Sequence, residues 1–86
     1  MNILTEYEIE HGPFLKGQVE RAKLLKYTVK KDYETSRTIA FTVGKDEKHS
    51  VMYNKTKHEW SCDCRWFSMK STYCSHILAV HLYLQR

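Results

Sequence analysis

The sequence is poor in proline and glycine, the residues typical of loops and linkers, and it has no long apolar run. Its 86 residues include one proline and three glycines, and the glycines are dispersed at positions 12, 17 and 44. A phosphate-cradling loop needs clustered glycines, so none is expected. No segment approaches the ~20 consecutive apolar residues that span a bilayer. Residues 1–11 lack the basic region and apolar run of a signal peptide. The sequence predicts one domain, residues 1–86, without a membrane partner.

Cysteine is also scarce, with three in the chain. An odd count argues against the disulfide framework of a small secreted protein. Thiols that stay reduced require a reducing compartment. We therefore expect an intracellular protein, in the cytoplasm or nucleoid or in the nucleus.

The three cysteines are grouped near the C-terminus together with one histidine. They form a Cys-x-Cys pair, nine intervening residues and a Cys-x-His pair, which comprise Cys62, Cys64, Cys74 and His76. Zn²⁺ takes four such ligands in a tetrahedron, and Cys₃His is an established structural set. Nine residues are enough to turn the chain and bring the pairs together. We expect these four residues to hold a structural Zn²⁺, which supplements the limited core of a short chain.

A competing ligand set includes His81. His76 and His81 have the spacing of the histidine pair in Cys₂His₂ fingers, and with Cys62 and Cys64 they would leave Cys74 out. On a helix, however, residues five apart differ by about 140° of rotation. The Cys-x-Cys spacing is also tighter than in those fingers. Both points favour Cys74.

The motif resembles that of a known family, the SWIM-type zinc finger. The resemblance lies in Cys62-Asp63-Cys64, in Phe67, and in the run Cys-Ser-His-Ile-Leu-Ala-Val over residues 74–80. It covers roughly residues 50–84. Arg65 stands where the family often has proline, which concerns the local loop.

The resemblance implies a module that binds DNA or proteins, as in transposase-like and chromatin-remodelling proteins. SWIM domains also occur in proteins that bind RecA/Rad51-type recombinases, and this small chain resembles such a partner of a DNA-repair or recombination protein. We expect a recognition module for DNA or for a DNA-handling complex of recombination, repair or transcription. The alternative implied is a purely protein–protein adaptor, for example to a RecA/Rad51-type recombinase paralogue, with no nucleic-acid contact.

The apolar pattern predicts an α+β fold. After the second ligand pair, Ile77, Val80 and Leu84 share a helical face, so we expect a C-terminal helix as the main core element. Upstream, β-branched and aromatic runs predict strands over residues 24–30, 38–43, 50–53 and 59–62. The expected architecture is a small antiparallel sheet of three to four strands with the C-terminal helix packed on it.

The chain divides into three parts within this domain. Residues 1–22 are expected to form an N-terminal arm and a short helix, the helix beginning at Pro13. Residues 1–11 alternate in the manner of an edge strand or a partly disordered arm. Residues 23–58 carry the antiparallel strands, with a turn over 31–36. Residues 59–86 are the SWIM-type finger with its helix.

Charge and chemistry indicate binding and exclude catalysis. The net charge of +4 combines −3 in residues 1–20, from four Glu and one Lys, with +7 in the rest of the chain. A closed zinc site leaves no position for a reactive water, and no catalytic triad is recognisable, so the protein is not expected to be an enzyme. Cations interleaved with aromatics suit nucleic acid. The candidate nucleic-acid contacts are Lys55, Lys57, Arg65, Trp66 and Lys70.

Overall fold

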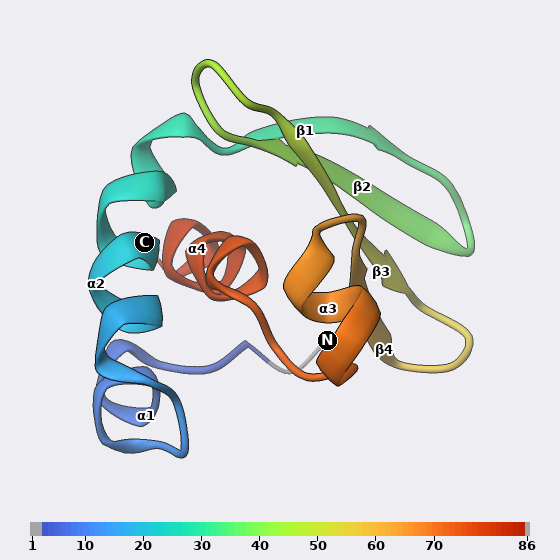
Figure 1. Cartoon of the computed structure of the whole chain (residues 1–86). Coiled ribbons are helices and arrows are strands. Elements are labelled where there is room, and N and C mark those ends of the chain that lie inside the picture. The colour runs from blue at the N-terminus through green and yellow to red at the C-terminus, as the bar shows by residue number, and fades with distance from the viewer. Residues whose placement is uncertain (1–2, 86) are drawn as a thin grey trace.

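The computed structural model describes residues 3–85 and consists of a four-stranded sheet with helices on one of its faces (Figure 1). The helices are α1 (Glu6–His11), α2 (Lys16–Leu25), the 3₁₀ helix η1 (Lys26–Thr28), α3 (Arg65–Lys70) and α4 (Ser75–Leu84). The strands are β1 (Lys30–Glu34), β2 (Thr38–Val43), β3 (His49–Asn54) and β4 (Glu59–Cys62). None of the described helices is long and apolar enough to cross a membrane.

The sheet is an antiparallel meander in the order β1-β2-β3-β4. Ile39, Phe41 and Val43 alternate along β2 and are all buried, because they face the helical layer. Val51 and Tyr53 of β3 do the same, and Tyr53 pairs with Trp60 of β4. The expected α+β class, with its sheet and C-terminal helix, is confirmed.

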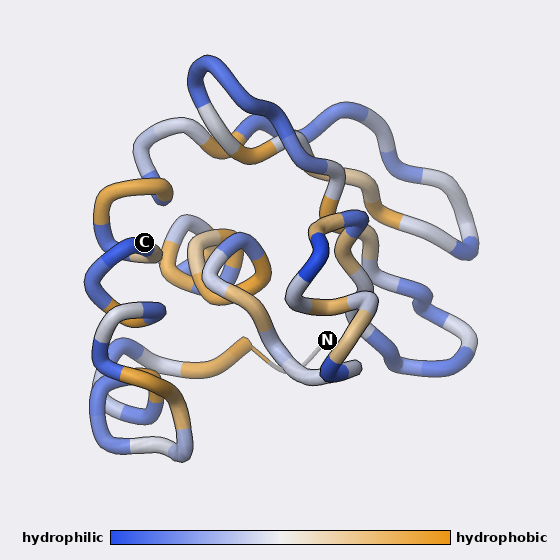
Figure 2. The backbone as a smooth tube through the Cα atoms, in the orientation of Figure 1, coloured by the Kyte–Doolittle hydropathy of each residue, from blue (hydrophilic) through white to orange (hydrophobic). Residues whose placement is uncertain are grey.

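Helix α4 is the centre of the core. It lies between α2 and the inner face of the sheet (Figure 1), and residues 77–82 are all buried. Figure 2 shows apolar residues around much of the circumference of α4, while the hairpin turns of the sheet are hydrophilic. A helix that is buried on all sides must be apolar on all sides, which explains the unbroken hydrophobic run at the C-terminal end.

The N-terminal segment corrects the sequence interpretation. Residues 6–11 form a helix and not an edge strand or a disordered arm. The Thr5 hydroxyl accepts from the Glu8 amide while the Glu8 carboxylate accepts from the Thr5 amide, which makes a capping box. This reciprocal pair stabilises a helix start. The next helix begins at Lys16, three residues later than the expected start at Pro13.

The expected first strand, residues 24–30, was also wrong. Helix α2 continues to Leu25 and η1 follows it, so the strand begins only at Lys30. It occupies much of the segment expected to be a turn. Every residue of β1 is exposed, because this edge strand joins the sheet mainly through backbone hydrogen bonds, with a bulge between Lys31 and Tyr33. A strand without an apolar face leaves no period-two signal in the sequence.

Two glycines give opposite predictions for alanine substitution. Gly17 lies in α2 with open space around the position of a Cβ, so Gly17→Ala should stabilise the fold by about 0.5–1 kcal/mol. Gly44 has φ +117° and a Cβ there would clash with the Glu47 backbone. Gly44→Ala should therefore cost about 1–3 kcal/mol. Urea denaturation at saturating zinc measures both, and equal effects of the two substitutions would contradict these assignments.

Candidate metal centre

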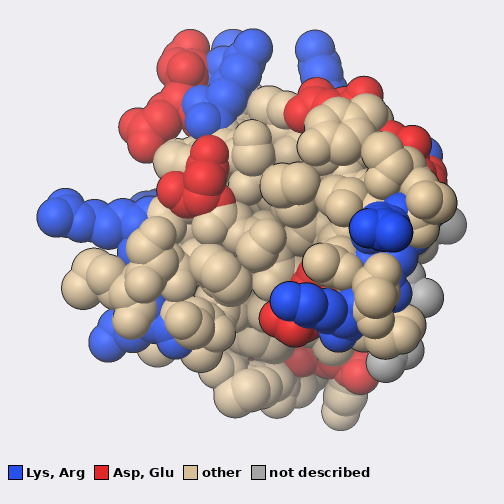
Figure 3. Space-filling model, turned by 90° about the vertical axis from the view of Figure 1, so that its right-hand side faces the viewer, with Lys and Arg blue, Asp and Glu red and all other residues tan. Residues whose placement is uncertain are grey.

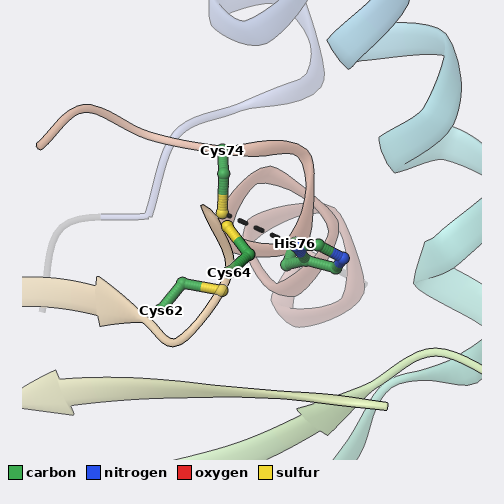
Figure 4. Close-up of side chains that lie close together, drawn as sticks. All are labelled: Cys62, Cys64, Cys74 and His76. Carbon is green, nitrogen blue, oxygen red and sulfur yellow. Dashed lines mark hydrogen bonds between the residues drawn. The ribbon is translucent and has the colours of Figure 1, made fainter. Parts of the chain in front are cut away.

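The structure brings the four expected ligands together. The ligand atoms of Cys62, Cys64, Cys74 and His76 all lie within 4.8 Å of one another. Figure 4 shows the three sulfur atoms and the imidazole converging between the end of β4 and the start of α4. The Cys74 Sγ and His76 Nδ1 atoms are 3.8 Å apart. The three cysteines are buried and His76 is half-buried.

Each ligand sits where a regular element begins or ends. Cys62 is the last residue of β4, and Cys64 is the residue that caps the N-terminus of α3. Cys74 caps the N-terminus of α4, and His76 lies in the first turn of that helix. The carbonyl oxygens of Cys64 and Cys74 accept the first helical hydrogen bonds, from Ser68 and Leu78. Backbone regularity on either side therefore limits the directions in which these side chains can point.

The residue between the first two ligands anchors their loop to the sheet. Asp63 donates its backbone N–H to the Ser50 carbonyl oxygen over 3.2 Å. Its carboxylate accepts from the Ser50 N–H at 3.1 Å and lies 3.2 Å from His49 Nδ1. The His49 ring in turn packs on the His76 ring, with centroids 4.2 Å apart. Asp63 and His49 thus connect both ligand pairs to the start of β3.

The electrostatics of the cluster favour a bound cation. A hydrogen bond with Cys74 raises the pKa of Cys62, and burial adds to the rise. The same hydrogen bond lowers the pKa of Cys74 to about 4, with help from His76 and the Ile77 amide. Burial raises the pKa of Cys64. Three thiolates so close together repel one another, and a dication relieves that repulsion by binding all three.

The donor set fits Zn²⁺. In a tetrahedron, zinc–sulfur bonds of ~2.3 Å and a zinc–nitrogen bond of ~2.0 Å separate two sulfurs by about 3.8 Å and a sulfur from the nitrogen by about 3.6 Å. The Cys74 Sγ to His76 Nδ1 distance of 3.8 Å is close to this, and small side-chain movements bring the whole cluster, which lies within 4.8 Å, to these distances. Four ligands close the tetrahedron, which is the arrangement of a structural site.

His81, the competing ligand, lies elsewhere. Its ring is fully buried in the core, with centroids 4.5 Å from Trp60 and 5.3 Å from Tyr73. Its Nδ1 accepts from the Leu4 N–H at 3.0 Å, so Nε2 carries the proton and has no hydrogen-bond partner among the described residues. His81 joins the N-terminal segment to α4 and is not part of the metal cluster.

The expected nucleic-acid contacts fall into two groups. Arg65, Trp66 and Lys70 lie on α3, next to the metal cluster, and the Lys70 Nζ atom lies 5.9 Å from the Trp66 ring centroid. Lys55 and Lys57 lie in the turn after β3, at the end of that strand away from His49 and Asp63. The Lys55 ammonium is held by Glu34 at 2.7 Å and by the Thr35 carbonyl oxygen at 2.9 Å.

A cleft of about 390 Å³ adjoins the metal cluster. Its walls come from α2, the β2–β3 turn, α3 and the start of α4, and include Arg21, Glu47, Arg65, Trp66 and His76. Sequence reasoning missed Arg21, because residue 21 is 44 positions from Arg65 in the chain and no local pattern joins them. Tyr73, just before the second ligand pair, is half-buried between Phe14 and His81.

Comparisons with known proteins agree with this geometry. The family model of the SWIM zinc finger matches residues 49–85, from the start of β3 through α4. Among curated proteins, Protein FAR-RED IMPAIRED RESPONSE 1 of Arabidopsis thaliana is 34% identical over 73 residues. The match covers 81% of this chain and 9% of that protein, so the chain corresponds to a small part of its relative. No solved structure matches the chain.

The ligand set can be tested by two substitutions. Cys74→Ser should abolish stoichiometric zinc and leave the chain unfolded, because zinc binding contributes on the order of 10 kcal/mol to folding of such domains. His81→Gln should retain one zinc per chain, since His81 lies outside the cluster. Elemental analysis of purified protein with circular dichroism checks both. A folded, zinc-loaded Cys74→Ser protein and a zinc-free His81→Gln protein would reverse the assignment.

His81 also predicts a pH dependence of stability. Burial lowers its pKa from 6.5 to about 4. Between these values the unfolded chain binds a proton that the folded chain does not, so stability falls as the pH drops below 6.5. Between pH 7 and pH 5 the wild type should lose about 2 kcal/mol more than His81→Gln. Acid release of zinc affects both proteins, so parallel pH profiles in urea denaturation would exclude this role.

Proposed function

Because residues 49–85 of the chain form a SWIM zinc finger, we propose that it is a recognition module that binds nucleic acid, DNA foremost, through α3. The SWIM zinc finger is a binding module and not a catalytic family. We propose accordingly that the chain has no enzymatic activity and acts inside the cell, in the cytoplasm, nucleoid or nucleus. The observation that carries the proposal is the position of α3, an exposed helix that begins directly after the ligand Cys64 and lies in the chain between the two ligand pairs.

Zinc has a structural role in this proposal. Held by Cys62, Cys64, Cys74 and His76, it cross-links the end of β4 to the start of α4. Helix α3 lies between the two ligand pairs and has no buried residue of its own, although Phe67 is partly buried against the core. Fixing the chain immediately before the helix and again at Cys74 presents a preorganised helix to a ligand, which lowers the entropy lost on binding.

The side chains of α3 have the chemistry of nucleic-acid contacts. Arg65 is exposed and forms no ion pair in the described structure, so its guanidinium is available to a phosphate. Trp66 is 37% exposed and has Lys70 beside it. An aromatic face next to cations supports stacking on a base together with backbone contacts. Lys57 is a peripheral contact, and Lys55 contributes less because Glu34 already neutralises it.

The second candidate function is a protein–protein adaptor. Met69 is 71% exposed on α3, three residues after Trp66, which gives this helix an apolar side. Figure 3 shows the side of the molecule that carries the β1–β2 and β3–β4 turns. On this face Lys and Arg are separated by acidic and uncharged residues and form no continuous stripe. A partner would then be a DNA-repair or recombination protein, such as a RecA/Rad51-type recombinase paralogue.

A binding titration separates these functions. Zinc-loaded protein should bind single- and double-stranded DNA saturably in fluorescence anisotropy, with affinity falling steeply as salt rises. Arg65→Gln/Lys70→Gln should weaken binding and reduce the magnitude of the single-strand salt slope by about 1.4, because two phosphate contacts are lost.

The matched control is Lys16→Gln/Lys23→Gln, which removes the same charge from α2 and should leave the slope close to that of the wild type. Absence of saturable binding at low salt would refute direct nucleic-acid recognition and leave the protein adaptor as the function.

A further inference from the structure

A second cationic hollow lies on the other side of the β2–β3 turn, outside the metal centre. It has a volume of about 330 Å³ and is formed where η1 and the start of β1 meet that turn. Its walls include Tyr27, Lys30, Gly44, Lys45 and Lys48, with no acidic residue among the residues that line it. Because two separate segments, residues 27–30 and 42–48, contribute to it, no local sequence pattern reveals it.

The cations of this hollow are free, unlike several others in the protein. Lys23, Lys31 and Lys55 each bind a carboxylate. Lys30, Lys45 and Lys48 form no ion pair within the described residues. The acidic residues closest in the chain lie outside the lining: Asp32 accepts a hydrogen bond from the Thr42 hydroxyl, and Asp46 and Glu47 belong to the β2–β3 turn. Three unpaired ammonium groups therefore line the concave surface with no carboxylate among them, which favours the approach of an anion.

Tyr27 gives the hollow an aromatic surface. Its side chain is 80% exposed, although a tyrosine in a small domain ordinarily packs against the core. The Lys26 ammonium lies 5.2 Å from its ring centroid. The Tyr27 ring therefore contributes little to the core, and the Lys26 ammonium adds a further cation beside it.

Two hydrogen bonds hold the floor of the hollow in place. The Gly44 N–H donates to Thr28 Oγ1 at 2.9 Å, and the Thr28 hydroxyl donates to the Leu25 carbonyl oxygen at 2.7 Å. These bonds join the end of α2 and η1 to the β2–β3 turn. The positive φ of Gly44, +117°, lets the β2–β3 turn close tightly on the Glu47 backbone. A preformed concave site of this kind needs little rearrangement to bind a ligand.

We infer that this hollow binds one nucleotide unit of a single-stranded nucleic acid, with the base stacked on Tyr27 and the flanking phosphates held by Lys30, Lys45 and Lys48. The chemistry of cations around one open aromatic ring is that of single-strand binding surfaces. A base in a duplex is stacked on both sides and cannot reach the ring. The inference rests on the proposed nucleic-acid function and narrows it to single strands.

The position of the hollow fits a strand that also contacts α3. The metal-side cleft is lined by Arg21 and Leu25 of α2, and the cationic hollow begins two residues farther along, at Tyr27. The β2–β3 turn separates them, with Glu47 on one side and Lys48 on the other. A single strand that crosses this turn would pass from the Tyr27 ring toward Arg65 and Trp66.

The test is the binding of an oligothymidylate of about 12 nucleotides to zinc-loaded protein, followed by anisotropy across a salt series. Tyr27→Ser should weaken binding roughly 5- to 150-fold, because stacking on one aromatic ring contributes about 1–3 kcal/mol. Tyr27→Phe should bind like the wild type, since it keeps the ring. Lys45→Gln/Lys48→Gln should reduce the salt slope by about 1.4 relative to the Lys16→Gln/Lys23→Gln control.

All of these positions are exposed except Lys23 of the control, which is half-buried and paired with Glu10, and zinc content with thermal melting verifies that each variant is folded. If the Tyr27 and Lys45/Lys48 variants bind like the control while Arg65→Gln/Lys70→Gln loses affinity, the inference about the hollow is overturned and the proposal for α3 stands. If only the Tyr27 and Lys45/Lys48 variants lose affinity, the hollow is supported as the binding site and the proposal for α3 is refuted. Absence of any binding by the wild type overturns both, and duplex binding that is as tight and independent of Tyr27 overturns the single-strand inference.

Discussion

The convergence of three thiols and one imidazole between β4 and α4 is the constraint on which the rest of the structure depends. Each ligand lies at a boundary of a regular element, so a bound Zn²⁺ fixes the end of β4 and the beginnings of α3 and α4 together. A domain of 86 residues has a small core, so its stability from apolar contacts is limited. The metal supplies the missing restraint where packing is weakest, at the short helix α3.

The apolar core and the metal centre hold different parts of the structure in place. Helix α4 is fully enclosed by α2 and the sheet, and its buried residues account for the docking of these elements. Trp60 connects the two systems, because it packs on Tyr53 and His81 and lies two residues before Cys62. Burial of the core positions the strand that carries the first ligand, and the ligand pair then positions the surface helix.

The metal motif and the buried elements were predictable from the sequence because their signals are local. The Cys-x-Cys and Cys-x-His pairs, the alternation in β2 and the apolar run of α4 each lie within a dozen residues. The first strand was not predictable, because β1 is exposed along its whole length and the alternation that suggested a strand belongs to the end of α2 and to η1. Helix α1 had a local signal, the Thr5–Glu8 capping box, which the alternation of glutamates in residues 6–10 obscured.

The lysines show why a surface site can escape sequence reasoning. Two of those that pair with carboxylates connect different elements: Lys23 of α2 reaches Glu10 of α1, and Lys55 in the β3–β4 turn reaches Glu34 at the end of β1. Such exposed pairs contribute about 0–1 kcal/mol each, so they guide local geometry more than they stabilise the fold. Lys30, Lys45 and Lys48 have no such role and surround an exposed tyrosine instead. Only the three-dimensional arrangement distinguishes the paired lysines from the free ones. Since unpaired like charges around a hollow weaken the isolated fold slightly, their grouping is best explained by an anionic ligand that neutralises them.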